Sequence, residues 1–191
     1  MLPEPIAITL QVTDALEGLG VAYFIGGSLA SAIHGISRAT MDVDIVADLH
    51  EEHLTALVKM LEGDFYIDDE AVHTAILRHS SCNLIHRETM FKVDIFVRKA
   101  RPYDHAQFDR RERQTLATEP ERFAYVASAE DMILAKLEWY RMGGEVSERQ
   151  WRDVQNIIKV QADRLDQAYL RGWAGQLGIS DLLESALAEG L

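Results

Sequence analysis

The sequence predicts an α+β fold, in which a small mixed sheet with flanking helices is followed by a helical C-terminal bundle. Up to about residue 120, short strand patterns alternate with amphipathic helix patterns. From Ser128 onward only helix patterns occur. The length of 191 residues suits one domain with a small appendage. We therefore expect a first domain at residues 1–125 and a helical subdomain packed on it at residues 126–191.

The first elements are a helix, a strand and a second helix joined by glycines. Apolar residues at helical spacing predict a helix over residues 8–19, and residues 21–25 form a short β-branched and aromatic run. Gly26 and Gly27 end that run, after which Ser28 is suited to cap a small-residue helix. The order is thus strand, glycine turn, helix.

Residues 41–47 predict a half-buried strand with acids on its polar face. Apolar residues alternate there with Asp42 and Asp44. Because side chains alternate between the two faces of a strand, both carboxylates point the same way.

Two helices and a hairpin follow. Helices are expected around residues 54–61 and 71–76, and residues 83–86 and 91–97 bracket a turn. The second hairpin strand again alternates, which places Asp94 and Lys92 on its polar face.

The C-terminal part carries two helix-capping signals, Ser128 with Asp131 and Ser147 with Gln150. Apolar stripes predict the buried faces of the helices beyond the first. The expected stripes are Trp151, Val154, Ile157 and Ile158; Tyr169, Trp173 and Leu177; and Leu182, Leu183, Ala186 and Leu187.

Composition limits the function classes. A net charge of −12 argues against a protein that coats nucleic acid through bulk electrostatics. The single cysteine, Cys82, excludes an intrachain disulfide and is expected to be a buried thiol. No cationic segment precedes an apolar run at the amino terminus, so we expect a cytoplasmic protein without a membrane segment.

Local basic charge occurs in two groups that could approach an RNA or an acidic partner, although a solvated helix face is the favoured interpretation. The groups are Arg98, Lys99 and Arg101, and Arg110, Arg111 and Arg113.

Asp42, Asp44 and Asp94 form the candidate metal site. An oxygen-only set of carboxylates suits Mg²⁺ or Mn²⁺, and a lone cysteine without a paired histidine motif does not suit zinc. The alternative is a solvated sheet face. Three uncompensated acids on one face repel each other, which favours the site.

The combined motif resembles the polymerase β-like nucleotidyltransferase superfamily. Residues 26–44 read Gly-Gly-Ser-x-Ala-x-x-x-His-Gly-x-x-Arg-x-Thr-x-Asp-Val-Asp, and Asp94 follows in an apolar strand. With Glu130, Asp131 and Lys136 in the tail, the chain is similar to minimal prokaryotic nucleotidyltransferases, some of which are abortive-infection-type toxins. The resemblance implies a nucleotidyltransferase fold and catalytic domain at residues 1–125.

The resemblance also implies a reaction, in which a nucleoside monophosphate moves from an NTP to an acceptor hydroxyl with release of pyrophosphate. Asp42 and Asp44 would hold one metal, and Asp94 would share a second and serve as the candidate base. The acceptor would be RNA such as tRNA, a protein or a small molecule.

Nucleotide-binding residues are expected at the glycine turn and beyond it. Gly26, Gly27 and Ser28 would hold phosphate oxygens at a helix amino terminus. Arg38 and Thr40 are placed to meet phosphate, with a surface charge as the alternative for Arg38.

Three further residues and one charged cluster have two interpretations each. His34 either packs in the core or touches ligand, and Lys92 either contacts triphosphate or offsets the acids. Lys136 either reaches phosphates, as the resemblance implies, or is solvent-exposed. Arg149, Arg152 and Asp153 either form a charged cluster of the toxin type or make surface ion pairs.

Two other functions compete with an active, metal-dependent enzyme. One is a nucleotide-binding protein that has lost turnover. The other is a toxin–antitoxin or assembly partner whose acidic surface engages a basic protein. The intact carboxylates favour the enzyme, because acids without a role would be costly to keep unpaired.

Overall fold

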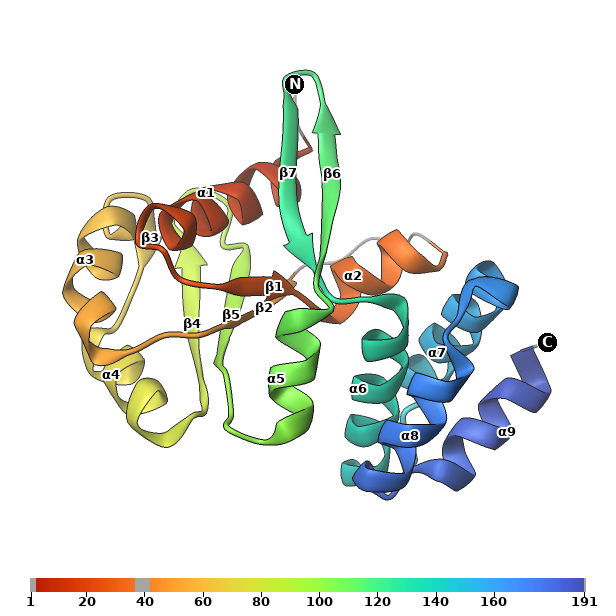
Figure 1. Cartoon of the computed structure of the whole chain (residues 1–191). Coiled ribbons are helices and arrows are strands. Elements are labelled where there is room, and N and C mark those ends of the chain that lie inside the picture. Colours follow the sequence, from red (N-terminus) through yellow and green to blue (C-terminus); the bar gives the residue numbers. More distant parts are fainter. Residues whose placement is uncertain (1–2, 37–41, 191) are drawn as a thin grey trace. The chain divides into compact units, whose positions relative to one another are not determined.

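The computed structural model describes residues 3–36 and 42–190 (Figure 1). The helices are α1 (Glu4–Gly18), α2 (Gly27–His34), α3 (Glu51–Leu61), α4 (Asp69–Arg78), α5 (Pro102–Asp109), α6 (Ala129–Met142), α7 (Glu148–Gln161), the 3-10 helix η1 (Ala162–Arg164), α8 (Gln167–Leu177) and α9 (Ser180–Gly190). The strands are β1 (Tyr23–Ile25), β2 (Asp42–Ala47), β3 (Phe65–Tyr66), β4 (Ser81–His86), β5 (Lys92–Val97), β6 (Glu112–Thr118) and β7 (Glu121–Val126).

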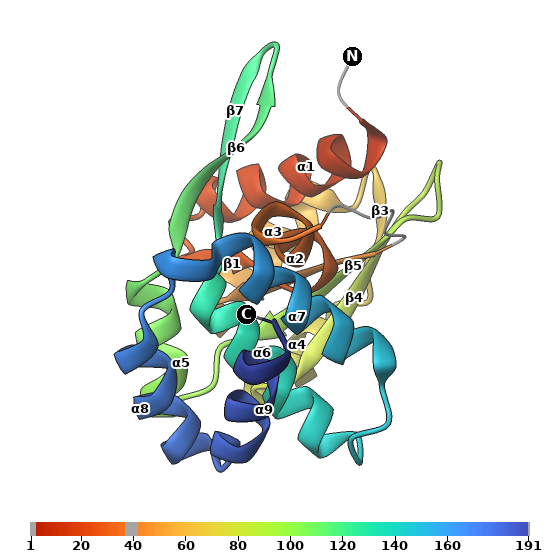
Figure 2. The same cartoon turned by 90° about the vertical axis from the view of Figure 1, so that its right-hand side faces the viewer.

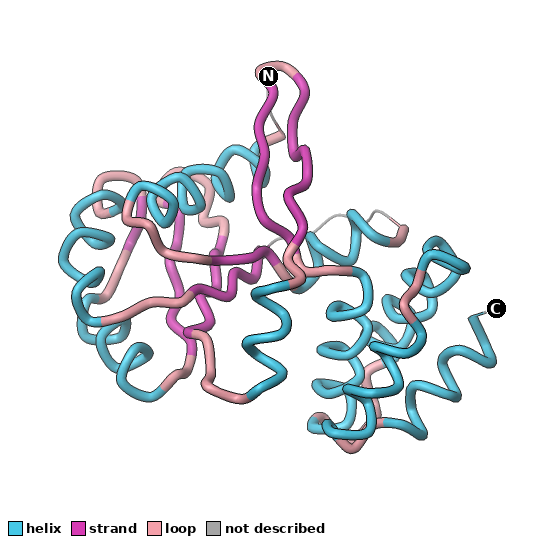
Figure 3. The backbone as a smooth tube through the Cα atoms, viewed as in Figure 1, coloured by secondary structure: helices cyan, strands magenta, loops and turns pink. Residues whose placement is uncertain are grey.

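The strands, magenta in Figure 3 and labelled in Figure 1, form one seven-stranded mixed sheet in the order β3-β4-β5-β2-β1-β7-β6. β2 lies between β1, to which it is antiparallel, and β5, to which it is parallel. β4 and β5 pair as the predicted antiparallel hairpin. The α+β prediction is therefore confirmed, with helices in the sequence between the strands and helices alone at the C-terminal end.

The alternation read from the sequence determines how the central strands are buried. Val43 and Ile45 of β2 and Val93 and Ile95 of β5 are fully buried, while the residues between them are partly exposed. Helices of the sheet unit pack against these strands: β2 contacts α1, and both β4 and β5 contact α4. Burial of each aliphatic side chain contributes about 1.5–3 kcal/mol, so this pattern fixes which face carries the acids.

The described residues divide into two compact units. A sheet unit comprises residues 3–28 and 42–126, and a helical unit comprises residues 29–36 and 127–190. The helical unit thus contains most of α2, which the sequence-based boundary assigns to the first domain.

Two helices of the helical unit, α6 and α7, begin at the serine caps predicted from the sequence. The Ser128 hydroxyl accepts from the Asp131 N–H, and the Ser147 hydroxyl accepts from the Gln150 N–H. Helices α7, α8 and α9 all contact α6, and Figure 2 shows them gathered around it.

One helix of this unit buries a different stripe from the predicted one. In α8 the buried residues are Leu170 and Ala174, whereas Tyr169, Trp173 and Leu177 are only half-buried. Tyr169 keeps its hydroxyl at the margin of the core, where it donates to Asp131 Oδ1 at 2.8 Å. Tyrosine and tryptophan combine an apolar ring with a polar group and favour such a half-buried position. This explains why Tyr169 and Trp173 are not part of the buried stripe.

The stretch between β5 and α6 also differs from expectation. It forms α5 and the β6–β7 hairpin, which extends beyond the rest of the sheet and joins β1 through Ile25 and Val126 (Figures 1 and 3). Arg113 therefore lies on a strand, and the expected helix face there is wrong. Its guanidinium stacks on the Phe123 ring at 3.7 Å from the centroid.

Across residues 3–36 and 42–190, no helix combines the length and hydropathy needed to cross a membrane.

Candidate active site

The three predicted acids lie on neighbouring strands of the sheet unit and on the same face. Asp44 and Asp94 are direct partners in the parallel register of β2 and β5, and Asp42 is the partner of Lys92. All three residues are partly exposed, whereas Val43, Ile45, Val93 and Ile95 on the same two strands are fully buried. The sheet therefore brings together carboxylates that come from distant parts of the sequence.

The glycine turn is attached to the acid strand by the backbone and by close contact. The Gly26 N–H donates to the Asp44 carbonyl at 2.8 Å. Gly27 has φ of +57°, and a Cβ placed there would lie 1.7 Å from Asp44 Oδ2. The Asp44 carboxylate thus occupies the space that any other residue at position 27 would need. Glycine is required at position 27 both by the positive φ and by the lack of space for a Cβ.

The helix that follows starts at Gly27, one residue earlier than the cap predicted at Ser28. Ser28 is buried within the first turn. The amino terminus of α2 consequently begins beside Asp44, and the dipole of a helix favours negative charge at this end.

Lys92 pairs with one of the three acids. Its Nζ lies 2.7 Å from Asp94 Oδ2, with 40% of the Lys92 side chain and 14% of the Asp94 side chain exposed. The pKa of Lys92 is raised, first by the hydrogen bond to Asp94 and then by the charges of Asp94, Asp42 and Asp44, while desolvation opposes the shift. Of the two interpretations of Lys92, this contact favours the one in which it offsets the acids.

The donor set has the chemistry of a hard-cation site. Carboxylates of Asp42, Asp44 and Asp94 share one face and supply only oxygen, the donor type that Mg²⁺ and Mn²⁺ prefer. In the described part of the chain, however, no group of three or more His, Cys, Asp or Glu side chains is arranged to hold an ion. The residue types fit a hard cation, while Asp94 is engaged in an ion pair with Lys92.

The thiol expected to be buried lies under this face. Cys82 is 3% exposed on β4, opposite Ile95, and burial followed by the charge of Asp94 raises its pKa to about 11.

We expect Cys82 to resist thiol reagents while the protein is folded. Because the thiolate is the reactive form, a pKa of about 11 leaves little of it at pH 8, and the thiol is also shielded. Reaction with a disulfide reagent at pH 8 should be at least ~100-fold slower in native buffer than in denaturant. Equal rates in the two conditions would show that the β4–β5 pairing opens readily.

Lys136 belongs to the helical unit and is not solvent-exposed, so that alternative is wrong. Its Nζ donates to Asp153 Oδ2 and to Gln150 Oε1, both at 2.9 Å. Its side chain is 7% exposed and that of Asp153 is 8% exposed. The buried pair links α6 to α7, and Asp153 is bound to Lys136 across the two helices. A contact of Lys136 with nucleotide stays a prediction.

Replacement of Lys136 by Met should destabilise the helical unit strongly. Removal of one partner of a buried ion pair leaves an uncompensated charge and typically costs about 3–5 kcal/mol. Urea unfolding measures this loss. The double variant Lys136→Met/Asp153→Leu should recover much of it, since no charge is then left buried. If the double variant is no more stable than the single one, the pair is not the source of the loss.

The remaining predicted positions have structural contacts or lie outside the described residues. His34 is buried, its Nε2 lies 2.7 Å from the Ala127 carbonyl, and its packing interpretation is favoured. Arg98 pairs with Asp48 at 2.9 Å, and Arg101 pairs with Asp104 at 2.8 Å. Arg38 and Thr40 fall within residues 37–41, outside the described chain.

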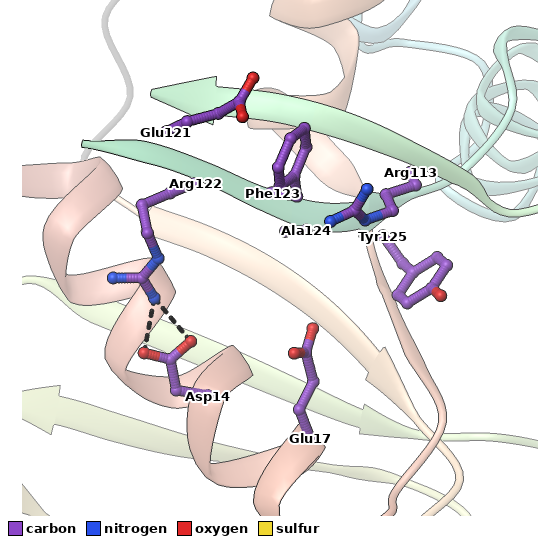
Figure 4. A pocket seen from close by; sticks show the side chains of 8 residues that line it. All are labelled: Asp14, Glu17, Arg113, Glu121, Arg122, Phe123, Ala124 and Tyr125. Carbon is purple, nitrogen blue, oxygen red and sulfur yellow. Dashed lines mark hydrogen bonds and ion pairs between the residues drawn. The ribbon is translucent and has the colours of Figure 1, made fainter. Parts of the chain in front are cut away.

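Two features escaped the sequence analysis. Asn83 on β4 is the register partner of Asp94 and adds an exposed amide beside the acids. A polar strand residue carries no such signal until the register is known. The second feature is an open pocket of about 250 Å³ between α1 and the β6–β7 hairpin (Figure 4), away from the acids. Its lining residues are Asp14, Glu17, Arg113, Glu121, Arg122, Phe123, Ala124 and Tyr125.

The fold is that of the nucleotidyltransferases. The chain is similar to an antigenic nucleotidyltransferase-like protein from Paracoccidioides brasiliensis, with 19% identity, a TM-score of 0.56, and coverage of 98% of this chain and 94% of that one. It is also similar to the lincomycin-bound lincosamide antibiotic adenylyltransferase LnuA, with 17% identity, a TM-score of 0.53, and coverage of 83% and 98%.

A third similar structure is that of ANT(2")-Ia in complex with adenylyl-2"-tobramycin, with 9% identity, a TM-score of 0.59, and coverage of 91% and 96%. At these identities the likeness establishes the shared fold. No protein-family model and no curated protein matches the sequence.

Proposed function

We propose that the protein is a metal-dependent nucleotidyltransferase that moves a nucleoside monophosphate from an NTP to an acceptor hydroxyl and releases pyrophosphate. One observation carries the proposal. Asp44 is at once the register partner of Asp94, the acceptor of the Gly26 N–H through its carbonyl, and the side chain packed against Gly27. The acids and the glycine turn therefore belong to a single local arrangement.

Each part of this arrangement has a task in the proposed reaction. The N–H groups at the start of α2, at Gly27 and Ser28, would donate hydrogen bonds to the phosphate oxygens. Asp42, Asp44 and Asp94 would hold Mg²⁺ or Mn²⁺, which when bound supplies charge stabilisation at the transferred phosphoryl group. Asp94 is the candidate acceptor of the proton from the attacking hydroxyl. Arg38, Thr40 and Lys136 are proposed phosphate contacts.

A small hydroxylated molecule is the proposed acceptor, with ATP as the donor to test first. Two of the similar structures are named for adenylyl transfer or an adenylylated antibiotic. tRNA and protein are the further acceptors to test, and an antitoxin is a further proposed binding partner. Because the donor is an intracellular nucleotide and Cys82 is a free thiol, a cytoplasmic location is part of the proposal.

The test is transfer of label from α-³²P-labelled NTPs in the presence of Mg²⁺. Acceptors should include aminoglycosides, lincosamides, total tRNA and a protein extract, each with wild type and Asp44→Asn. Label transfer and pyrophosphate release by wild type alone support the proposal. NTP binding by calorimetry without pyrophosphate release would instead favour the catalytically silent alternative.

A further inference from the structure

Lys92 is a cation in direct contact with one of the candidate metal ligands, Asp94, and lies on the same strand, β5. Its Nζ contacts Asp94 Oδ2 at 2.7 Å, and it is the register partner of Asp42 on β2. We propose that Lys92 is a displaceable counter-cation, which holds Asp94 in the metal-free protein and must release it before a divalent ion can be held by the three acids. This inference rests on the proposed function.

The acids require a positive charge when no metal is bound. Asp42, Asp44 and Asp94 share one partly exposed face, and like charges so placed repel each other. The ammonium of Lys92 lies close enough to interact with all three. It can therefore stabilise the folded sheet before any ligand arrives.

The same contact blocks the metal-binding arrangement. Asp94 Oδ2 is an oxygen that a divalent ion would use, and in the described residues no three acids come together to hold one. Lys92 and the ion thus compete for Asp94.

Lys92 is free enough to leave. With 40% of its side chain exposed, it can move its ammonium into water at small cost, whereas Asp94, at 14% exposed, is held by the sheet. Displacement consequently moves the lysine and leaves the carboxylate in place.

The test compares Lys92→Met and Lys92→Arg with wild type, using Mn²⁺ without nucleotide. Lys59→Met, on the exposed side of α3, is the matched control for loss of one positive charge. Isothermal titration should show about three- to tenfold tighter Mn²⁺ binding by Lys92→Met, the gain expected from loss of a partly exposed competing ion pair. Lys92→Arg and Lys59→Met should match wild type.

Two readouts separate displacement from a general charge effect. In EDTA, Lys92→Met should unfold at a lower temperature than wild type, and Mn²⁺ should raise that temperature more in the variant. In wild type, the ¹⁵N signal of the Lys92 Nζ should shift when Mg²⁺ is added, and Lys92→Arg identifies this signal by its loss.

The proposal is overturned by unchanged or weaker Mn²⁺ binding in Lys92→Met, by an unmoved Lys92 signal at saturating Mg²⁺, or by the absence of Mn²⁺ binding to every variant. Failure of label transfer with all acceptors, alongside the expected Mn²⁺ binding, contradicts the proposed transferase activity and leaves the displacement intact.

Discussion

Asp44→Asn should abolish nucleotidyl transfer while the protein remains folded. The charge stabilisation supplied by a bound divalent ion is several kcal/mol, and each ~1.4 kcal/mol is a tenfold change, so we expect a loss of about 10³-fold or more in rate. Asparagine keeps the shape of the side chain that packs against Gly27. It also removes one of three repelling charges, so the unfolding temperature should hold or rise.

Asp64→Asn is the matched control for Asp44→Asn. Asp64 is exposed in the turn before β3 and is remote in the sequence from the three acids. Transfer assays and thermal unfolding should be run on both variants. Wild-type activity in Asp44→Asn would remove the acid face from the proposed site. Parallel losses of activity and folding would show a structural role for Asp44 instead.

Gly27→Ala is the second substitution with a large expected effect, and here both folding and activity should fall. An L-residue at φ of +57° costs about 1–2 kcal/mol, and the new methyl group would meet the Asp44 carboxylate. Together we expect a loss of about 2–4 kcal/mol, or roughly 5–10 °C in unfolding temperature for a chain of this size. Displacement of Asp44 should also lower transfer at least ~100-fold.

The neighbouring glycine is a sharp control for folding. At Gly26 the nearest atom to an added Cβ is on the Phe24 ring, 4.0 Å away, in ordinary contact. Gly26→Ala should therefore unfold close to the wild-type temperature. If Gly27→Ala is as stable as Gly26→Ala, Asp44 does not press on the turn in solution.

Local patterns were sufficient to predict the elements that carry the acids. Alternation in β2 and β5 reports burial on one face directly, so the positions of Asp42 and Asp44 on the polar face of β2 and of Asp94 on the polar face of β5 were predictable. The serine caps of α6 and α7 were equally local. Each of these signals depends on residues within a few positions of one another.

Other features depend on partners that lie far away in the sequence. β6 and β7 lack a regular apolar alternation, because much of the hairpin is exposed on both faces and is stabilised by contacts such as Arg113 on Phe123. Lys136 looks like an ordinary surface lysine on α6 until Asp153 is placed opposite it. The ion pair between Lys92 and Asp94 likewise could be identified only from the three-dimensional structure.

The parallel pairing of β2 with β5 has a consequence for how the acid face comes into being. Between these strands lie α3, β3, α4 and β4, so their pairing closes a long loop, which is slow relative to the formation of local structure. Asp44 and Asp94 become neighbours only when β2 and β5 have paired. A chain in which this pairing has not formed lacks the assembled acid face, so any activity that uses this face depends on folding of the sheet.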